Sequence, residues 1–178
     1  MIFTRLHNYL KKFSILNKYQ YGFRKSSSTS HAIYDIYYNQ LKSRAAGQLT
    51  CSIYEDISKA FDTVDHSILI EKLESYGIRG NVLQLLISYI TKRKQYTVIN
   101  GIASTELEII FGVPQGSTLG PLLFLIYMND LTYSTKAIIK LFADDTCILI
   151  SARTIKQLQI EVNKEINKVE KWMSIVTN

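Results

Sequence analysis

Phe142-Ala143-Asp144-Asp145-Thr146 is the stretch that decides the fold, because it sets two adjacent carboxylates between the mostly apolar runs Ile138–Leu141 and Cys147–Ile150. Two such runs around a short polar segment predict a β-hairpin. In a tight hairpin the charges of Asp144 and Asp145 lie close together, which is costly unless a cation compensates them. Hard divalent cations prefer oxygen ligands, but aspartate is also a common turn residue. The pair therefore predicts a metal site only if the chain supplies a third carboxylate.

The bulk composition predicts one folded domain. The chain has 178 residues, is 47% hydrophobic and carries a formal net charge of +6. A basic balance favours a polyanionic partner such as nucleic acid, although a basic protein without such a partner fits the charge equally well. The two cysteines, Cys51 and Cys147, lie in apolar segments and indicate reduced thiols. No stretch resembles a signal peptide or a membrane span, so we expect an intracellular protein, cytoplasmic or nuclear, without membrane contact.

The spacing of apolar residues predicts an α+β alternation of helices and short strands. Helices are expected at residues 2–16, 30–44, 66–76, 81–90 (capped by Asn81), 121–129 and after 154. Strands are expected at residues 49–57, 96–100 and 107–111, with a turn at Asn100-Gly101, beside the hairpin around 142–146. Thr154-Ile155-Lys156-Gln157 has the capping-box pattern. The helix that follows carries one apolar stripe and is expected to cover a sheet: Ile155, Leu158, Val162, Ile166, Val169 and Met173.

The third carboxylate is Asp56, which ends a predicted strand and is followed five residues later by Phe61. Taken alone, this is an ordinary strand-to-helix junction, in which Asp62 serves equally well as a helix cap. One acid on a central strand and two on the neighbouring hairpin, Asp144 and Asp145, can hold two Mg²⁺ ions roughly 3.5–4 Å apart. These three carboxylates are what two-metal phosphoryl transfer requires.

Four motifs that occur in order closely resemble the reverse transcriptase domain of non-LTR retrotransposons (LINE-like elements). They are Gln20-Tyr21-Gly22-Phe23-Arg24, the run Asp56–His66, Gly112–Ser117 followed by Leu119–Phe124, and Phe142–Asp145. The resemblance covers essentially the whole chain. It implies a right-hand polymerase palm, an antiparallel sheet backed by helices, in residues 51–178. It further implies partial fingers in residues 1–50, to which the hairpin at 92–112 is expected to contribute.

The resemblance implies that Asp56 and Asp144 bind both metal ions and that Asp145 is the less direct ligand. The ions would be Mg²⁺, with Mn²⁺ as an alternative. In the family, the primer 3′-hydroxyl attacks the α-phosphate of a dNTP in line, and pyrophosphate leaves. The partners implied are therefore an RNA template, a DNA primer and dNTPs.

Four further residues are implied in dNTP binding. Lys59 and Ala60 fall where backbone N–H groups meet the triphosphate. Phe61 occupies the position that stacks under the sugar and rejects a 2′-hydroxyl, although packing in the core would explain the same ring. Arg24 resembles the fingers arginine that pairs with the triphosphate, a task that suits a bidentate guanidinium. A solvated loop arginine is the alternative for Arg24.

Two other groups are assigned by the resemblance or by charge. Gln115 and Gly116 resemble the loop that approaches the nucleotide and the templating base pair, where glycine lets backbone come close. Lys92, Arg93 and Lys94 follow a predicted helix. Their charges would stabilise the negative end of the helix dipole as readily as they would contact a template phosphate. The overall basic charge leads us to expect template contact.

Two features depart from the family pattern. Glu55 stands where the family has an apolar strand residue, and strand alternation turns it away from Asp56, which predicts a buried, unpaired carboxylate. In the family, a primer-grip hairpin and a thumb follow the last motif, and we expect both to be absent from the chain that ends at Asn178. Two alternatives to an active polymerase therefore stay open: a catalytically silent nucleic-acid-binding remnant and a group II intron-type maturase palm. The oligomeric state stays undetermined.

Overall fold

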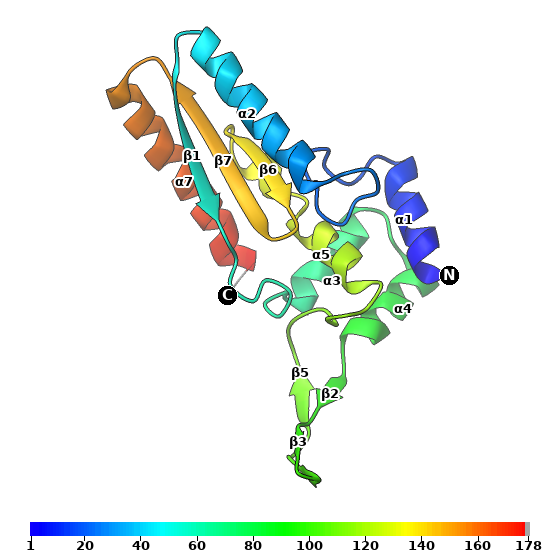
Figure 1. Cartoon of the computed structure of the whole chain (residues 1–178). Coiled ribbons are helices and arrows are strands. Elements are labelled where there is room, and N and C mark those ends of the chain that lie inside the picture. The colour runs from blue at the N-terminus through cyan, green and yellow to red at the C-terminus, as the bar shows by residue number, and fades with distance from the viewer. Residues whose placement is uncertain (177–178) are drawn as a thin grey trace.

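The structure is a computed structural model that describes residues 1–176 (Figure 1). Its helices are α1 (Ile2–Lys12), α2 (Thr29–Ala45), α3 (His66–Ser75), α4 (Gly80–Ile90), α5 (Gly120–Met128), α6 (Leu131–Ser134) and α7 (Ile155–Val176). Its strands are β1 (Leu49–Glu55), β2 (Arg93–Gln95), β3 (Val98–Ile99), β4 (Ile102–Ala103), β5 (Leu107–Ile109), β6 (Ile138–Phe142) and β7 (Asp145–Ala152). Within residues 1–176, every helix is too short or too polar to cross a membrane.

The main sheet is antiparallel, with strand order β1-β7-β6. The expected α+β class and antiparallel sheet are therefore confirmed. The hairpin predicted around Asp144 is the β6–β7 connection, in which Phe142 pairs with Asp145. The strand before Asp56 was expected at the centre of the sheet, and that detail is wrong for the described residues, because β7 lies between β1 and β6.

Helices cover both faces of this sheet (Figure 1). On one face lies α2, where the hydroxyls of Ser43 and Ser151 are 2.8 Å apart and the Gln40 amide donates to the Ser52 hydroxyl at 2.8 Å. On the other face lie α5 and α7, where Ile148 and Val169 are fully buried. Residues 1–50 thus include a helix that packs on the sheet, and the division into fingers and palm stays a prediction.

The centre of the core is α5, which is buried on all sides because almost every residue in it is apolar. Pro121 stands in its first turn, as predicted. Backbone N–H groups in a first turn have no partner within the helix, so the missing N–H of proline costs no helical hydrogen bond there. The predicted cap of α7 is also present, since the Gln157 N–H donates to the Thr154 hydroxyl at 3.2 Å. Its apolar stripe packs on the core except for Ile155, which is 67% exposed at the start of the helix.

Several element boundaries differ from those predicted. The first helix ends at Lys12 rather than residue 16, because Ser14 adopts a left-handed conformation with φ 51°. Asn81 is not a cap, since α4 begins at Gly80 with Arg79 before it. Asp65, and not Asp62, caps α3 by accepting from the N–H groups of Ser67 and Ile68.

The segment between α4 and α5 forms an arm that projects away from the sheet (Figure 1). It consists of two short antiparallel ladders, β2 with β5 and β3 with β4. The predicted turn at Asn100-Gly101 is confirmed, because both residues take positive φ angles of 51° and 81°. The strands predicted at 96–100 and 107–111 are shorter than expected.

Candidate active site

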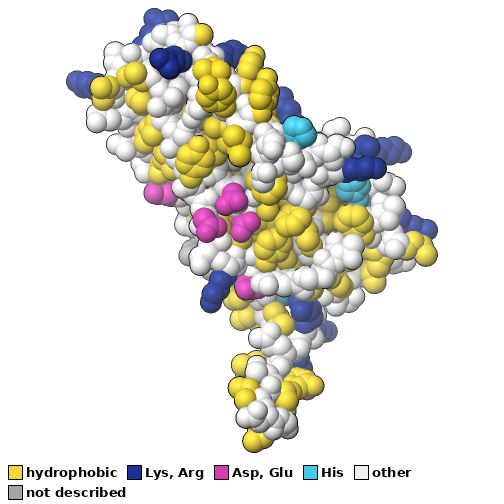
Figure 2. All heavy atoms as spheres, in the orientation of Figure 1, with side chains coloured by type: hydrophobic (Ala, Val, Ile, Leu, Met, Phe, Trp, Pro, Cys, Tyr) yellow, Lys and Arg dark blue, Asp and Glu magenta, His cyan; other side chains and the backbone are white. Residues whose placement is uncertain are grey.

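The three predicted carboxylates meet at one end of the main sheet. The β1–β7 ladder ends with Glu55 opposite Thr146, so the next step of the same register sets Asp56 opposite Asp145. Asp144 lies in the two-residue turn that leads into β7. Asp56 and Asp145 line the same cavity of about 320 Å³ between α2 and the sheet. Figure 2 shows acidic side chains gathered at this end of the sheet.

The charges of these carboxylates are not compensated by the described part of the chain. Among residues 1–176, no donor or cation forms a hydrogen bond or an ion pair with the side chain of Asp56, Asp144 or Asp145. This is notable in a protein whose net charge is +6. Oxygen donors without protein partners suit a hard divalent cation.

The carboxylates are not already arranged as a finished metal cage. Within the described residues, no group of three or more His, Cys, Asp or Glu side chains has the closeness needed to hold a metal ion. The donor set at the end of β1 and at the β6–β7 turn therefore fits Mg²⁺ by its chemistry. Its side chains would have to close around the ion on binding.

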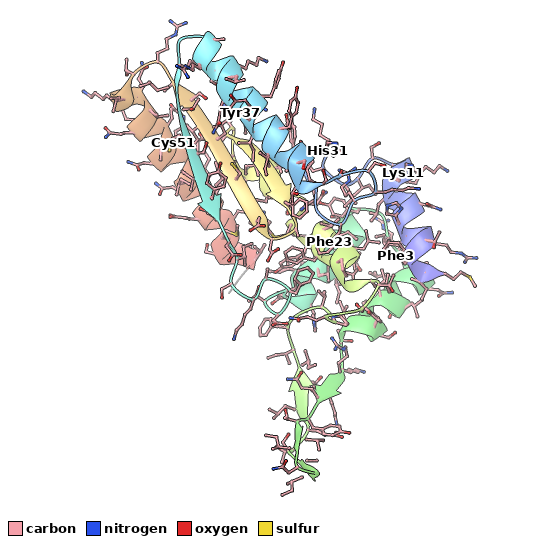
Figure 3. All side chains as sticks on the ribbon, viewed as in Figure 1. Phe3, Lys11, Phe23, His31, Tyr37 and Cys51 are labelled. Carbon is pink, nitrogen blue, oxygen red and sulfur yellow. The ribbon has the colours of Figure 1, made fainter. Side chains whose placement is uncertain are left out.

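Phe61 is held between two other aromatic rings. Its ring stacks on Phe124 of α5, with centroids 4.4 Å apart, and meets the edge of Phe23 at 5.9 Å. Figure 3 shows Phe23 in the loop between α1 and α2, near α5. The packing alternative for this ring is therefore supported by direct contacts, and its role towards a sugar stays a prediction.

The neighbouring residues of the Phe61 loop differ in how they present their backbone. Lys59 is exposed and takes a left-handed conformation with φ 53°. Ala60 is buried, and its N–H donates to the Ile57 carbonyl at 3.1 Å. The Ala60 N–H would have to leave this bond before it could meet a triphosphate.

The Gly112–Ser117 motif lies directly against the Phe61 loop. Val113 N–H donates to the Phe61 carbonyl at 2.8 Å, and the Gln115 amide donates to Asp62 at 2.7 Å. Gly116 is exposed and takes φ +72°, with nothing within 4 Å of where a side chain would begin. The structure therefore brings Gln115 and Gly116 to the same loop cluster as Phe61.

Arg24 does not line the cavity that holds Asp56 and Asp145. Its guanidinium donates to the carbonyl oxygens of Asn17 at 2.6 Å and Gln20 at 3.3 Å. It lines a separate cavity of about 710 Å³, bounded by α1, the following loop and Tyr133. The ionisable lining of this cavity consists mainly of cations, with no carboxylate: His7, Lys11, Lys18, Arg24 and Lys25. Figure 3 shows Lys11 on α1 at this side of the molecule.

The basic run after α4 lies at the base of the arm. Lys92 and Lys94 are exposed, and Arg93 begins β2. Lys94 forms an exposed ion pair with Glu106 at 3.3 Å. None of the three lines the cavity that holds Asp56 and Asp145.

Glu55 is half-buried, whereas strand alternation predicted a buried carboxylate, and it lines a cavity together with Asp56. It pairs in register with Thr146, whose side chain is buried. Burial, together with the nearby charge of Glu170, raises the pKa of Glu55 above its ordinary value. No ion pair involves Glu55 within residues 1–176.

One residue of the site was quoted in a motif but given no role. Gln20 is buried, and its side-chain amide contacts the peptide of Ala143 in the β6–β7 turn. A polar residue directly before the Tyr21-Gly22 pair was the only sequence signal. Because the two residues are separated by 123 positions, the contact cannot be read from local spacing.

The chain is similar to known proteins over nearly its whole length. A family model described as reverse transcriptase (RNA-dependent DNA polymerase) matches residues 2–176. The probable RNA-directed DNA polymerase from transposon X-element of Drosophila melanogaster is 30% identical over 158 residues, which cover 86% of this chain and 17% of the relative. The probable RNA-directed DNA polymerase from transposon BS of the same organism is 26% identical, over 97% of this chain and 20% of the relative. The chain thus spans about a fifth of the length of these curated relatives.

A solved structure shares the fold at low sequence identity. The telomerase from Candida tropicalis in complex with a fragment of telomeric RNA superposes with a TM-score of 0.64 at 13% identity. The match covers 96% of this chain and 31% of the telomerase chain. This likeness confirms the expected palm fold.

Proposed function

The chain belongs to the reverse transcriptase (RNA-dependent DNA polymerase) family, and on this premise we propose that it forms the core of an RNA-directed DNA polymerase of a non-LTR retrotransposon. The reaction is transfer of a nucleotide from a dNTP to the 3′-hydroxyl of a DNA primer on an RNA template. The family uses divalent metal ions. The polymerase activity and its substrates are proposed for this chain on the strength of its site.

One observation carries this proposal: three carboxylates that form no hydrogen bond or ion pair within residues 1–176 lie at the same end of the sheet, at the end of β1 and at the β6–β7 turn. Asp56 and Asp144 would bind both ions, and Asp145 would support them. When bound, two Mg²⁺ ions, or Mn²⁺ in their place, supply positive charge at the attacking oxygen and at the leaving pyrophosphate. The chain itself contributes the position of the ligands, and Lys140, the lysine that lines the cavity at this site, is paired with Asp35.

The incoming dNTP would occupy the space beside the Phe61 loop. Phe61 would present a rigid ring to the sugar, because Phe124 and Phe23 hold it from two sides. Gln115 and Gly116 would border the base pair, since the Val113–Phe61 backbone bond ties their loop to the Phe61 loop. Lys59 is exposed and is available to the phosphates. The N–H of Ala60 would also reach them if its hydrogen bond to the Ile57 carbonyl opened.

The template and primer would be bound mainly through their phosphates. The cavity lined by Lys11, Lys18, Arg24 and Lys25 offers positive charge without a carboxylate. In this conformation Arg24 supports its own loop, so its pairing with a triphosphate would require the loop to move. Lys92 and Arg93 would add charge at the base of the arm.

Primer extension tests the proposal. The 178-residue chain is incubated with an RNA template, a labelled DNA primer, dNTPs and Mg²⁺. We expect incorporation that Asp144→Asn reduces by at least about a hundredfold, as is typical for the loss of a group that acts on the transition state. Glu74→Gln, which neutralises an exposed carboxylate on α3, should leave the rate unchanged. Absence of incorporation at every protein concentration would refute the polymerase.

A second candidate function is favoured by the basic cavity. The chain would bind RNA through Lys11, Lys18, Arg24 and Lys25 without catalysing synthesis. This second function predicts that the protein binds RNA with an affinity that falls steeply with salt and that it incorporates no nucleotides. Salt-dependent RNA binding by a protein that also incorporates nucleotides would support the polymerase instead. A group II intron-type maturase shares the palm and is distinguished by which RNA the protein selects.

We place the protein inside the cell, in the cytoplasm or the nucleus. Both cysteines, Cys51 and Cys147, are free thiols, which fits a reducing compartment. Burial raises the pKa of the Cys147 thiol, so this group stays protonated and poorly reactive at neutral pH.

A further inference from the structure

The amide of Gln20 binds both backbone groups of Ala143, a residue of the carboxylate turn. Its Oε1 accepts from the Ala143 N–H at 3.0 Å, and its Nε2 donates to the Ala143 carbonyl at 3.2 Å. The same Oε1 also accepts from the Gly22 N–H at 2.7 Å. Gln20 is only 3% exposed, so water does not replace these bonds. The residue before Asp144 is therefore held at both its donor and its acceptor.

Ala143 needs such support because of its backbone conformation. It adopts φ 58°, in the left-handed region that is unfavourable for an L-residue with a Cβ. The two hydrogen bonds from the Gln20 side chain to the backbone of Ala143 are buried, so they offset that strain. Without them, the turn that carries Asp144 and begins β7 at Asp145 would be free to relax.

The loop around Gln20 is itself fixed to the sheet and to α2. The Tyr21 N–H donates to the Leu141 carbonyl at 2.8 Å, and the Leu141 N–H donates to the Tyr19 carbonyl at 2.9 Å. The phenol of Tyr21 donates to Asp35 of α2. The amide therefore acts from a rigid base and not from a mobile loop.

Close approach of the backbone makes this contact specific. A Cβ at Gly22 would lie 2.1 Å from the Ala143 nitrogen, a distance that backbone atoms cannot accommodate. Glycine at this position thus lets the loop reach the turn, and Gln20 then binds it. The Gln20–Arg24 motif and the Phe142–Asp145 motif form one physical unit.

We propose that Gln20 is a positioning residue, which holds the Ala143–Asp144 turn in its left-handed form and so presents Asp144 and Asp145 in the geometry that binds metal. This inference rests on the proposed polymerase function. Gln20 touches neither substrate nor metal in this assignment. It acts only through the backbone N–H and carbonyl of Ala143.

The test measures primer extension by the 178-residue chain at several Mg²⁺ concentrations. Gln20→Leu removes all three hydrogen bonds and keeps similar bulk. We expect kcat to fall at least about tenfold, since a misplaced catalytic group costs up to about a hundredfold. The Mg²⁺ concentration for half-maximal rate should rise, while KM for the dNTP stays within about twofold. Gln40→Leu is the matched control, because the Gln40 amide also spans α2 and the sheet, where it donates to Ser52.

Rescue separates positioning from general destabilisation. Glycine adopts a positive φ without the Cβ penalty, so the double variant Gln20→Leu/Ala143→Gly should have a kcat at least about threefold higher than that of Gln20→Leu alone. The inference is overturned if Gln20→Leu keeps kcat within about twofold of the wild type. It is also overturned if Gln20→Leu and Gln40→Leu lose the same kcat with unchanged Mg²⁺ dependence.

A second readout is independent of activity. Amide hydrogen exchange of Ala143 in the wild-type chain should be slow, because its N–H is bound to Gln20. Exchange as fast as that of an open turn would overturn the inference even in an active polymerase. A protected Ala143 amide in a chain that incorporates nothing would leave the positioning contact supported while the proposed function fails.

Discussion

The ring of Phe61 stacks on the ring of Phe124, with centroids 4.4 Å apart and planes inclined by 25°. Phe124 is 1% exposed in α5, so it forms a fixed support, and Phe23 meets Phe61 from another side. Packing and selection against a 2′-hydroxyl are therefore compatible, because a ring can exclude an oxygen only if it cannot move aside. The two roles predict different results on substitution.

Phe61→Val should admit ribonucleotides. The smaller side chain opens space where the ring lies, so we expect the ratio of rNTP to dNTP incorporation to rise at least about tenfold, a change of about 1.4 kcal/mol. Loss of the stacked ring should also lower the free energy of unfolding by about 1–3 kcal/mol. Single-nucleotide incorporation and urea denaturation measure the two effects.

Phe124→Leu is the control for Phe61→Val. It removes the support and destabilises the core, yet it keeps the ring of Phe61. Its loss of stability should match or exceed that of Phe61→Val, with a much smaller change in sugar selection. An active Phe61→Val protein with unchanged selection would leave Phe61 a packing residue only.

The ion pair between Lys140 and Asp35 should stabilise the contact between β6 and α2. Lys140 is 3% exposed and Asp35 is 30% exposed, and the Lys140 ammonium also lies 3.8 Å from the centroid of the Tyr19 ring. Burial alone would raise the pKa of Asp35, but hydrogen bonds from Lys140 and Tyr21 outweigh it and lower that pKa. Asp35→Asn should therefore cost about 3–5 kcal/mol, because it leaves a buried ammonium unpaired.

Urea denaturation of Asp35→Asn can be compared with that of Glu106→Gln. The latter breaks the Lys94–Glu106 pair, which is exposed on both sides and should contribute less than about 1 kcal/mol. Adding Lys140→Met to Asp35→Asn should restore part of the stability, since the unpaired charge is removed. Equal losses for Asp35→Asn and Glu106→Gln would show that the buried pair has no special weight.

Sequence patterns predicted the features that depend on neighbours along the chain. Pro121 in the first turn of α5, the Thr154 cap and the Asn100-Gly101 turn all follow from the backbone preferences of a few adjacent residues. The β6–β7 hairpin around Asp144 and Asp145 follows from the same local logic.

Contacts between distant residues were not predictable in this way. Asp35 and Lys140 are 105 positions apart, and the strand order that leaves β1 at the edge depends on which segments pair in space. Arg24 shows the same limit, because its bonds to the Asn17 and Gln20 carbonyls depend on the path of its loop. Motif resemblance identified the carboxylates but gave Gln20 no role.

Glu165 should make the protein sensitive to acid. It is 3% exposed, and burial alone would raise its pKa, but hydrogen bonds from Lys168, Thr135 and the Lys136 N–H outweigh burial and lower the pKa to about 2. A depressed pKa in the folded state adds stability that is complete above the ordinary value of 4.5 and is lost as the pH falls towards 2. A shift of this size corresponds to about 3 kcal/mol.

Glu165→Gln should lower the free energy of unfolding at pH 7 and flatten its decline between about pH 5 and pH 2. Chemical denaturation at several pH values measures both. Glu161→Gln is the control, since the carboxylate of Glu161 is 43% exposed and, among residues 1–176, pairs only with Lys164 at 3.2 Å. If the free energy of unfolding of Glu165→Gln fell with acid as steeply as that of the wild type, groups other than Glu165 would cause the acid sensitivity.

Glu55→Gln should stabilise the protein at neutral pH and leave it unchanged at low pH. Burial and then Glu170 raise the pKa of Glu55, so stability declines as the pH rises from the ordinary value of 4.5 through the raised one. Neutral glutamine avoids this decline, and the gain in the free energy of unfolding should stay below about 1 kcal/mol at pH 7. Denaturation at pH 4 and pH 7, with Glu71→Gln on the exposed side of α3 as the control, decides the matter. An equal gain at both pH values would mean that packing, and not the buried charge, limits stability at this strand.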